Sequence, residues 1–366
     1  MHPKEDEISV TFFGPGFGES IAIHVGDRNW IIIDSCLNDG KEPAALAYLT
    51  QIGVDISTEV KLIMATHWHD DHIKGLSKTL EACASSAFAM PISMCKREFL
   101  TFLYAYENQP KLALGRGGTE ILNCMKQLKA REKKFVVQDK VVQVWDSETL
   151  SHGKRVELIA VSPSEKRVED FLRAIGSFLD GIPERPSMTS PPKSRIHTSN
   201  KNDLSIATVL TIGDFALLFG ADVEESGCAD YGWSNIVTSR IGRVPKPHIY
   251  KVAHHGSIGA HHDDIWREIL EDQPISVVTP WVLGGNFLPQ DRDKARIKSL
   301  SGRTFVTSSE RLSLKKRYER DRLKMIERSG VKVNGCIYRS GSVTFTIDPQ
   351  SGKTTSEVLA GSAARI

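Results

Sequence analysis

The sequence predicts an α/β fold in which β-sheets carry helices on their outer faces. Short apolar runs bounded by Gly, Pro, Asn and Asp recur along the chain, which is the pattern of strands and hairpins. Segments with apolar residues at helical spacing intervene regularly, and stacked layers of sheet and helix bury both kinds of apolar face. With 366 residues the chain is long enough for a sizeable core.

The first third of the chain alternates strand-like runs with helical segments. Strands are expected at 8–13, 20–25, 30–33 and 60–65, with a Gly-rich turn over 14–18. Pro43 opens a predicted helix over 43–52, because proline is favoured in a first helical turn. The strand 60–65 runs into Thr66-His-Trp-His-Asp-Asp-His72, and a helix is expected after it, over 73–84.

Two segments in the middle of the chain are expected to be insertions. Residues 98–134 are rich in Lys and Arg and helical in pattern, with a break at Gly115-Arg-Gly-Gly118. Residues 183–199 are rich in Pro and Ser without periodicity, which predicts a long loop of the kind that covers a site. Strands are expected between them, at 136–144 and 156–161.

The second half returns to strand-like runs and ends in a basic segment. Strands are expected at 205–212, 215–219, 249–253 and 275–280, and helices at 263–270 and 310–329. The basic helix is either a solvated face or the wall of a groove for a phosphate backbone. A last hairpin is expected around Gly341. We expect one domain over 1–310, with 311–366 packed on it.

Composition narrows the classes of protein. The formal net charge is +2, so no global preference for nucleic acid or membrane is expected. The six cysteines form no C-x-x-C pair and are expected to be reduced thiols. The N-terminus lacks an apolar signal region, and no run approaches about 18 apolar residues, so we expect a cytoplasmic protein without a membrane span.

The strongest functional signal is the cluster His67-Trp-His69-Asp-Asp71-His72. Imidazole nitrogens and carboxylate oxygens are zinc ligands that leave room for a water. Side chains at i and i+2 of an extended segment project to the same side, so His67 and His69 are expected to hold one metal. Asp71 and His72, where the chain turns into a helix, are expected to hold a second.

This H-x-H-x-D-H pattern resembles the signature of the metallo-β-lactamase superfamily, and further residues between about 8 and 310 match the family's order. The resemblance implies an αβ/βα sandwich of four layers, two mixed sheets with helices outside, and a hydrolase with two divalent metals, zinc foremost and manganese an alternative. Asp34 corresponds to a carboxylate that orients a ligand. Asp222 corresponds to the carboxylate shared by both metals, and His254-His255 includes the late histidine of the second metal.

Within the superfamily, the closest resemblance is to the C-terminal hydrolase domain of ComEC-type competence DNA-uptake proteins. It rests on Phe13-Gly-Pro-Gly-Phe-Gly-Glu-Ser20, Asn202-Asp-Leu-Ser205, Lys251-Val-Ala-His-His-Gly-Ser257 and Gly285-Asn286. Two positions depart from that branch. Leu288 stands where the branch has a histidine before proline, and Asp222 follows Gly-Ala instead of Gly alone, which adds one residue of slack.

Several assignments stay open. The third ligand of the first metal is Asn202 by the branch pattern, His197 by ligand chemistry, or a water. Either His254 or His255 binds the second metal, and His255 keeps the family's register. Lys251 either contacts a phosphate or is only a cation at a strand end, and Ser257 either caps the next helix or supports the site.

The implied activity is hydrolysis by a hydroxide activated between two metals. A phosphodiesterase or nuclease acting on nucleic acid or nucleotide is favoured, with Asp71 or Asp222 orienting the hydroxide and Lys251 stabilising the leaving oxygen. The alternatives are a lactonase or phosphorylcholine-esterase-like hydrolase, and a metal-bearing subunit that acts with a partner protein. Fold alone does not choose among them.

Overall fold

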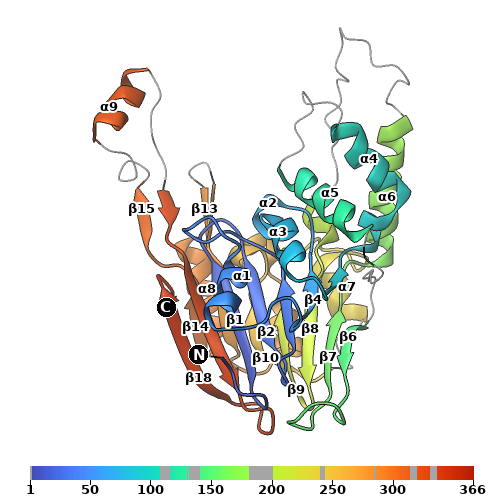
Figure 1. The fold of residues 1–366 in the computed structure, drawn as a ribbon, viewed down its shortest axis with the longest axis vertical. Helices are drawn as coiled ribbons and strands as arrows, with labels where there is room; N and C mark the ends of the chain where they lie inside the picture. Colours follow the sequence, from blue (N-terminus) through green and yellow to red (C-terminus); the bar gives the residue numbers. More distant parts are fainter. Residues whose placement is uncertain are drawn as a thin grey trace.

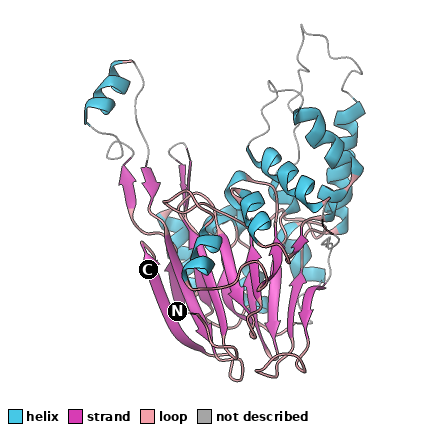
Figure 2. Ribbon diagram, viewed as in Figure 1, coloured by secondary structure: helices cyan, strands magenta, loops and turns pink. Residues whose placement is uncertain are grey.

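Two mixed β-sheets organise the protein in a computed structural model, which describes residues 2–107, 116–129, 131, 141–180, 201–239, 244–283, 286–313, 320–329 and 336–366. The seven-stranded sheet has the order β18-β17-β1-β2-β3-β4-β5, and the eight-stranded sheet the order β19-β14-β11-β10-β9-β8-β7-β6. They lie face to face, with helices outside (Figures 1 and 2).

The strands of the first sheet are β1 (Ile8–Gly14), β2 (Ser20–His24), β3 (Trp30–Ile33), β4 (Val60–Met64), β5 (Ala87–Ala89), β17 (Gly341–Ile347) and β18 (Thr354–Gly361). Those of the second are β6 (Val141–Trp145), β7 (Val156–Ala160), β8 (Thr208–Ile212), β9 (Phe215–Phe219), β10 (Pro247–Lys251), β11 (Ile275–Val278), β14 (Arg303–Val306) and β19 (Ala364–Arg365). Neighbours β3, β4 and β5 are parallel, as are β9, β10, β11 and β14. Two further antiparallel pairs form two-stranded sheets: β12 (Trp281–Leu283) with β13 (Asn286–Leu288), and β15 (Arg311–Ser313) with β16 (Cys336–Tyr338).

The helices are α1 (Ala44–Gln51), α2 (Asp70–Ile73), α3 (Leu76–Ala82), α4 (Arg97–Glu107), α5 (Arg116–Leu128), α6 (Glu165–Asp180), α7 (Gly232–Ser239), α8 (Asp291–Leu300) and α9 (Arg320–Arg328). Short helical turns lie at Ile92–Cys95, Lys201–Leu204, His254–Gly256, Ile258–Ala260 and Ile265–Ile269, the last with π geometry.

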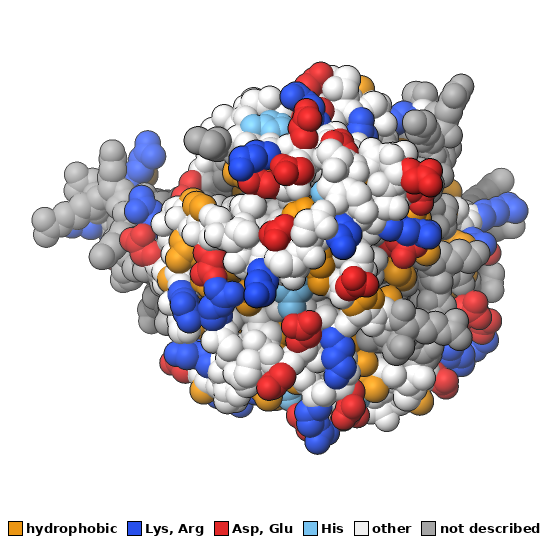
Figure 3. All heavy atoms as spheres, turned by 90° about the horizontal axis from the view of Figure 1, so that it is seen from below, with side chains coloured by type: hydrophobic (Ala, Val, Ile, Leu, Met, Phe, Trp, Pro, Cys, Tyr) orange, Lys and Arg blue, Asp and Glu red, His pale blue; other side chains and the backbone are white. Residues whose placement is uncertain are grey.

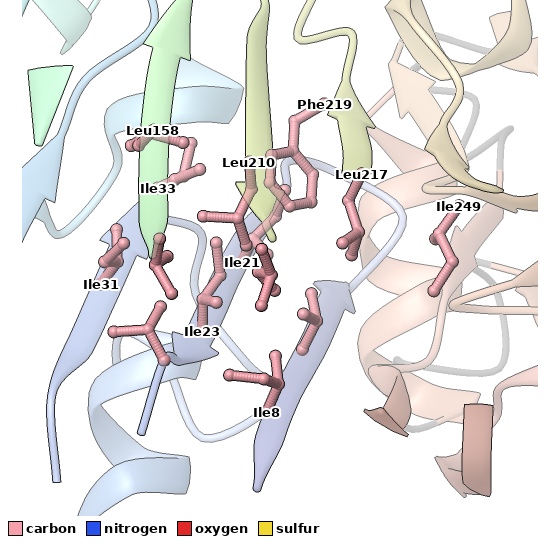
Figure 4. Packing of buried hydrophobic residues seen from close by; sticks show 14 of the residues in the cluster. Ile8, Ile21, Ile23, Ile31, Ile33, Leu158, Leu210, Leu217, Phe219 and Ile249 are labelled. Carbon is pink, nitrogen blue, oxygen red and sulfur yellow. The ribbon is translucent and has the colours of Figure 1, made fainter. Parts of the chain in front are cut away.

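Three apolar clusters separate the four layers. The central cluster joins the facing sides of the sheets, with Ile8, Ile31 and Ile33 opposite Leu210 and Leu217 (Figure 4). Side chains alternate along a strand, so Trp30 and Ile32 face the other way, into a cluster shared with α1, α3 and α5. Ala216 and Leu218 of β9 likewise face α7 and α8. Strands buried on both sides explain why their sequences are apolar without alternation.

The predicted α/β fold of two mixed sheets with outer helices is confirmed by this layering. The C-terminal segment joins both sheets, because β17 pairs with β1 and β19 with β14. The hairpin predicted around Gly341 turns instead between β17 and β18, since Gly341 begins β17 and pairs with Gly361. The described cysteines Cys36, Cys83, Cys95, Cys124 and Cys228 are free thiols. At the lower end of the sandwich, positive and negative side chains are interspersed (Figure 3).

Several element predictions were wrong in detail. The helix predicted over 310–329 is strand β15 followed, after a gap in the described residues, by α9, since Arg311–Ser313 pairs with β16. The helix predicted over 73–84 is divided at Gly75, whose φ is 86°. The π-helical turn Ile265–Ile269 replaces the helix predicted over 263–270. Helices α6, α7 and α8 were not predicted. The loop 183–199 and the first part of the strand predicted over 136–144 lie outside the described residues.

Candidate metal centre

The predicted site residues gather at one edge of the sandwich, where parallel strands end. Asp34 follows β3 and His67 follows β4 in the first sheet, while Asp222 follows β9 and His255 follows β10 in the second. The carboxyl ends of parallel strands meet at one edge, which is where α/β folds place ligands. The short helix α2, which carries Asp71 and His72, lies at this edge (Figure 1).

The first group of donor atoms comes from His67, His69 and Asp222, whose ligand atoms lie within 4.8 Å of one another. His67 Nε2 is 3.1 Å from His69 Nδ1 and 3.8 Å from Asp222 Oδ2. Burial, followed by the neighbouring His72 and His69, holds the pKa of His67 well below its ordinary value. A lowered pKa favours the neutral imidazole, which is the form that binds a metal.

The second group consists of the buried residues Glu19, His72, Asp222 and His255, also within 4.8 Å of one another. Asp222 Oδ1 is 3.2 Å from His72 Nε2 and 3.7 Å from His255 Nε2. Asp71 Oδ2 is 3.2 Å from the same nitrogen of His255. Asp222 thus turns one carboxylate oxygen to each group, which is the arrangement of a shared carboxylate.

Outward hydrogen bonds decide where the imidazole protons lie. His72 Nδ1 donates to Asp34 Oδ2 over 2.7 Å, and His255 Nδ1 donates to the carbonyl oxygen of Thr279 over 2.9 Å. Both acceptors lack a proton to give, so a neutral ring keeps its lone pair on Nε2. A carboxylate or carbonyl behind each histidine is the usual support of a metal ligand.

The facing atoms of the site therefore fit divalent cations. When His72 and His255 are neutral, their Nε2 lone pairs point at the carboxylate of Asp222 in a buried environment. Acceptors that face one another without a proton or cation between them are costly to bury. Burial lowers the pKa of His72, yet Asp222, Glu19 and Asp34 overcome this and hold it well above its ordinary value. The carboxylates that raise this pKa would also attract a cation.

Four non-glycine residues around the site have a left-handed backbone. Asp34, Ala221, His254 and His255 have φ values of 58°, 45°, 45° and 54°. Such conformations cost about 1–2 kcal/mol each, and they cluster where a structure over-determines a functional geometry. Ala221 takes up the additional residue of Gly-Ala-Asp, so Asp222 still lies between the two groups.

Two residues whose assignment as ligands was open, Asn202 and His254, both contact Glu224. Asn202 Nδ2 donates to Glu224 Oε1 over 2.8 Å, and His254 Nδ1 lies 3.0 Å from the same oxygen. Among the described histidine, cysteine and acidic side chains, His255 belongs to the second donor group and His254 belongs to neither group. This geometry favours His255 over His254 as a ligand. His197 lies outside the described residues.

Lys251 and Ser257, the two other residues with open assignments, make contacts within the protein. Lys251 is fully buried and forms an ion pair with Glu19, so its ammonium group does not face a surface where a phosphate could approach. Ser257 Oγ accepts a hydrogen bond from Gly259 N over 3.3 Å, which is the capping role. Burial thus disfavours direct phosphate contact by Lys251.

Four residues that support the site were not identified as site residues from the sequence. Glu19 lies next to both imidazoles, Thr66 bridges Asp34 and His67, Glu224 holds Asn202, and Thr279 holds His255. Glu19 carried a signal, because it stands inside the Gly-rich stretch used for the family resemblance. Thr66, Glu224 and Thr279 carried none, since their roles depend on contacts across the fold.

Aromatic side chains border the site. The Trp281 ring stacks on His255 with ring centres 6.4 Å apart and planes at 25°. Trp281 pairs across the β12–β13 hairpin with Leu288, so Leu288 also lies at the border of the site. Lys74 Nζ lies 5.7 Å from the ring centre of Phe17, which adds a cation just after the segment that carries the candidate ligands, residues 66–72.

Comparison with known proteins gives likenesses of fold. No protein-family model and no curated protein matches the sequence. A subclass B3 metallo-β-lactamase, MEM-A1 from a soil metagenome library, is 14% identical, with 73% of this chain and 83% of that chain covered and a TM-score of 0.34. The metallo-β-lactamase-fold protein YhfI of Bacillus subtilis is 12% identical, with 82% and 96% covered and a TM-score of 0.39.

These scores are low, so the fold rests on the sheet order and layers described above. The narrower likeness to competence DNA-uptake proteins has no support among these structures and stays a prediction from the motifs. Of the helices that the structure describes, none combines the length and the apolar character needed to cross a bilayer.

Proposed function

We propose that this protein is a metal-dependent hydrolase whose two divalent metals are held by His67, His69, Asp71, His72, Asp222 and His255. The observation that carries the proposal is the carboxylate of Asp222. Its two oxygens face separate groups of histidine nitrogens, one at 3.8 Å and the other at 3.2 and 3.7 Å. A structural salt bridge would not need four converging imidazoles.

When bound, two divalent cations supply a water of lowered pKa and neutralise charge on the group under attack. The chain's own residues supply orientation. Asp34 accepts hydrogen bonds from Thr66 N, Thr66 Oγ1 and His72 Nδ1, each at 2.7 Å, and this fixes the ring of His72. Asp71 Oδ2, beside His255, is the oxygen that we propose to orient the attacking water and take its proton.

The proposed substrate is a phosphodiester in a nucleic acid or nucleotide. Support comes from the aromatic and cationic border formed by Trp281, Phe17 and Lys74, while the Lys251–Ser257 and Asn202–Ser205 motifs contribute only their resemblance in sequence. A base can stack on such aromatic faces while a cation contacts the phosphate. The other candidates, a lactone or a phosphorylcholine ester, belong in the same substrate panel.

The test is metal analysis combined with turnover of bis-p-nitrophenyl phosphate. Wild-type protein should carry about two zinc or manganese ions per chain. His69→Ala should lose metal from the first group, and Asp222→Asn should lose metal from both. Each variant should lose more than about 100-fold in turnover, because ligands matter more than the residues behind them.

His262→Ala is the matched control, since this histidine lies near Glu225 outside both donor groups and should keep metal and turnover. Wild-type protein that binds no metal after reconstitution would overturn the proposal. Two metals with turnover of a lactone or a phosphorylcholine ester, and of no phosphodiester, would keep the metal centre and replace the substrate.

A further inference from the structure

A buried ion pair lies behind the second group of metal ligands. Glu19 and Lys251 are 2% and 0% exposed, and the Glu19 carboxylate contacts the Lys251 ammonium group. Such a pair is costly to bury and adds little stability over a packed apolar pair, so its position next to the metal centre needs another explanation. The rest of this inference builds on the proposed metal centre.

Glu19 faces the far side of both imidazoles. Its Oε1 is 3.8 Å from His72 Nδ1, and its Oε2 is 3.8 Å from His255 Nδ1. The nitrogens that face Asp222 are the Nε2 atoms, on the opposite edge of each ring. Glu19 therefore lies behind these ligands, where supporting carboxylates sit, although its distance alone would admit it to the ligand set.

The oxygen of Glu19 that meets Lys251 has a second partner. Thr279 Oγ1 donates to Glu19 Oε2 over 2.6 Å, and the carbonyl oxygen of the same threonine accepts from His255 Nδ1. The amide of Glu19 donates to the carbonyl oxygen of Asp71 over 3.0 Å. Glu19 is thus fixed by both sheets and cannot move to the Nε2 side without breaking these contacts.

We propose that Glu19 and Lys251 are positioning residues that balance charge at the second metal position. Lys251 holds the carboxylate of Glu19 away from the ligand set, and Glu19 cancels an ammonium charge that would otherwise repel the cation. Asp34, Asp71 and Asp222, together with the attacking hydroxide, would then supply the negative charge that offsets two divalent cations.

The two charges have opposite effects on a cation, so single substitutions should shift its affinity in opposite directions. Glu19→Gln leaves a buried ammonium group and should weaken binding of the second Zn²⁺ by at least about 10-fold. Lys251→Met leaves a buried carboxylate and should not weaken it. The double variant Glu19→Gln/Lys251→Met removes both charges and should bind within about 3-fold of wild type.

The measurement is Zn²⁺ titration against a chelator at pH 7, with the visible spectrum of the Co²⁺-loaded protein as a report on ligand number. Either single variant leaves one buried charge without its partner and should also lower Tm by about 5 °C or more. The double variant removes both charges and should recover Tm. If Glu19→Gln does not fold, Lys251→Met and the double variant still test the prediction. Lys246→Met, an exposed lysine just before β10, is the control that should change nothing.

Two results would overturn this inference alone. Loss of the second metal in both Glu19→Gln and the double variant, with a changed Co²⁺ spectrum, would make Glu19 a ligand. Unchanged affinity in all three variants, with only Tm affected, would make the pair structural. Wild-type protein without metal would instead overturn the proposed function, and this inference with it.

Discussion

At the residue scale, the hydrogen bond on the far edge of each histidine separates the candidate ligands from the other histidines. His72 and His255 give their Nδ1 protons to Asp34 and Thr279, which leaves Nε2 free to face Asp222. His254 instead turns Nδ1 to Glu224 and has a more exposed side chain, at 23%. Two adjacent histidines with similar φ values, 45° and 54°, therefore have different hydrogen-bond partners.

His24 gives a prediction at the same scale that does not involve the metal centre. It is buried beside Trp30, and burial lowers its pKa to about 4 from an ordinary 6.5, although the carbonyl oxygen of Glu7 partly opposes this. Between these pH values the unfolded chain binds more protons than the folded one. The folded state should therefore lose stability as pH falls from 6.5 to 4, by roughly 3 kcal/mol at most.

His24→Asn removes this titration while keeping a donor for the carbonyl oxygen of Glu7, which accepts over 2.8 Å. Urea unfolding of metal-free protein at pH 7 and pH 4.5 should show a smaller loss of stability in the variant than in wild type. Equal losses in the two proteins would mean that His24 is protonated without penalty in the folded state.

At the element scale, the Gly-rich loop between β1 and β2 packs against the segment that carries the candidate ligands, residues 66–72. Gly18 has a φ of 106°, and a Cβ atom there would lie 2.4 Å from the carbonyl oxygen of Asp71. Ser20 Oγ donates to the carbonyl oxygen of Asp34 over 2.8 Å. The loop thus holds two segments that carry candidate ligands and their support.

Gly18→Ala should therefore destabilise the protein and weaken the second metal position. Gly53→Ala is the matched control, because Gly53 also has a positive φ, of 86°, but a Cβ atom there would meet nothing within 4 Å. The control should cost about 1 kcal/mol from backbone strain alone, and Gly18→Ala at least about 2 kcal/mol more. Urea midpoints and Zn²⁺ affinity measure both effects, and equal costs would refute the close contact.

At the scale of the whole molecule, the C-terminal segment completes the sandwich. Val343, Phe345 and Ile347 of β17 are fully buried between the sheets. The outermost strand β18 is mostly exposed, with Val358 53% exposed. The domain boundary at 310 stays a prediction. The first sheet includes β17, which comes after that boundary.

Graded truncation tests this dependence. A chain ending at residue 340 lacks β17 and should fail to fold, because it loses core side chains and exposes β1 as an edge. A chain ending at residue 350 lacks β18 and β19 and should fold with reduced stability. Circular dichroism with urea unfolding separates the two, and a cooperative transition for the shorter chain would show that the core forms without β17.

The sequence by itself determined the fold class, most strands of both sheets and the local metal motif. It could do so because strand and helix periodicities are local, and because His67, His69, Asp71 and His72 lie within six residues. The family resemblance added Asp34, which directly follows β3, and Asp222, which lies three positions beyond the end of β9, as candidate site residues. Helices α6 to α8 were missed although α6 is long.

Only the tertiary structure decided which distant side chains meet at the site. Glu19 and Thr279 are 260 positions apart, and their hydrogen bond exists because the two sheets pack face to face. The same packing buries Lys251 against Glu19, turns His255 inward and directs Asn202 to Glu224. No local spacing encodes these contacts, because each depends on how loops from different strands converge at one edge of the sandwich.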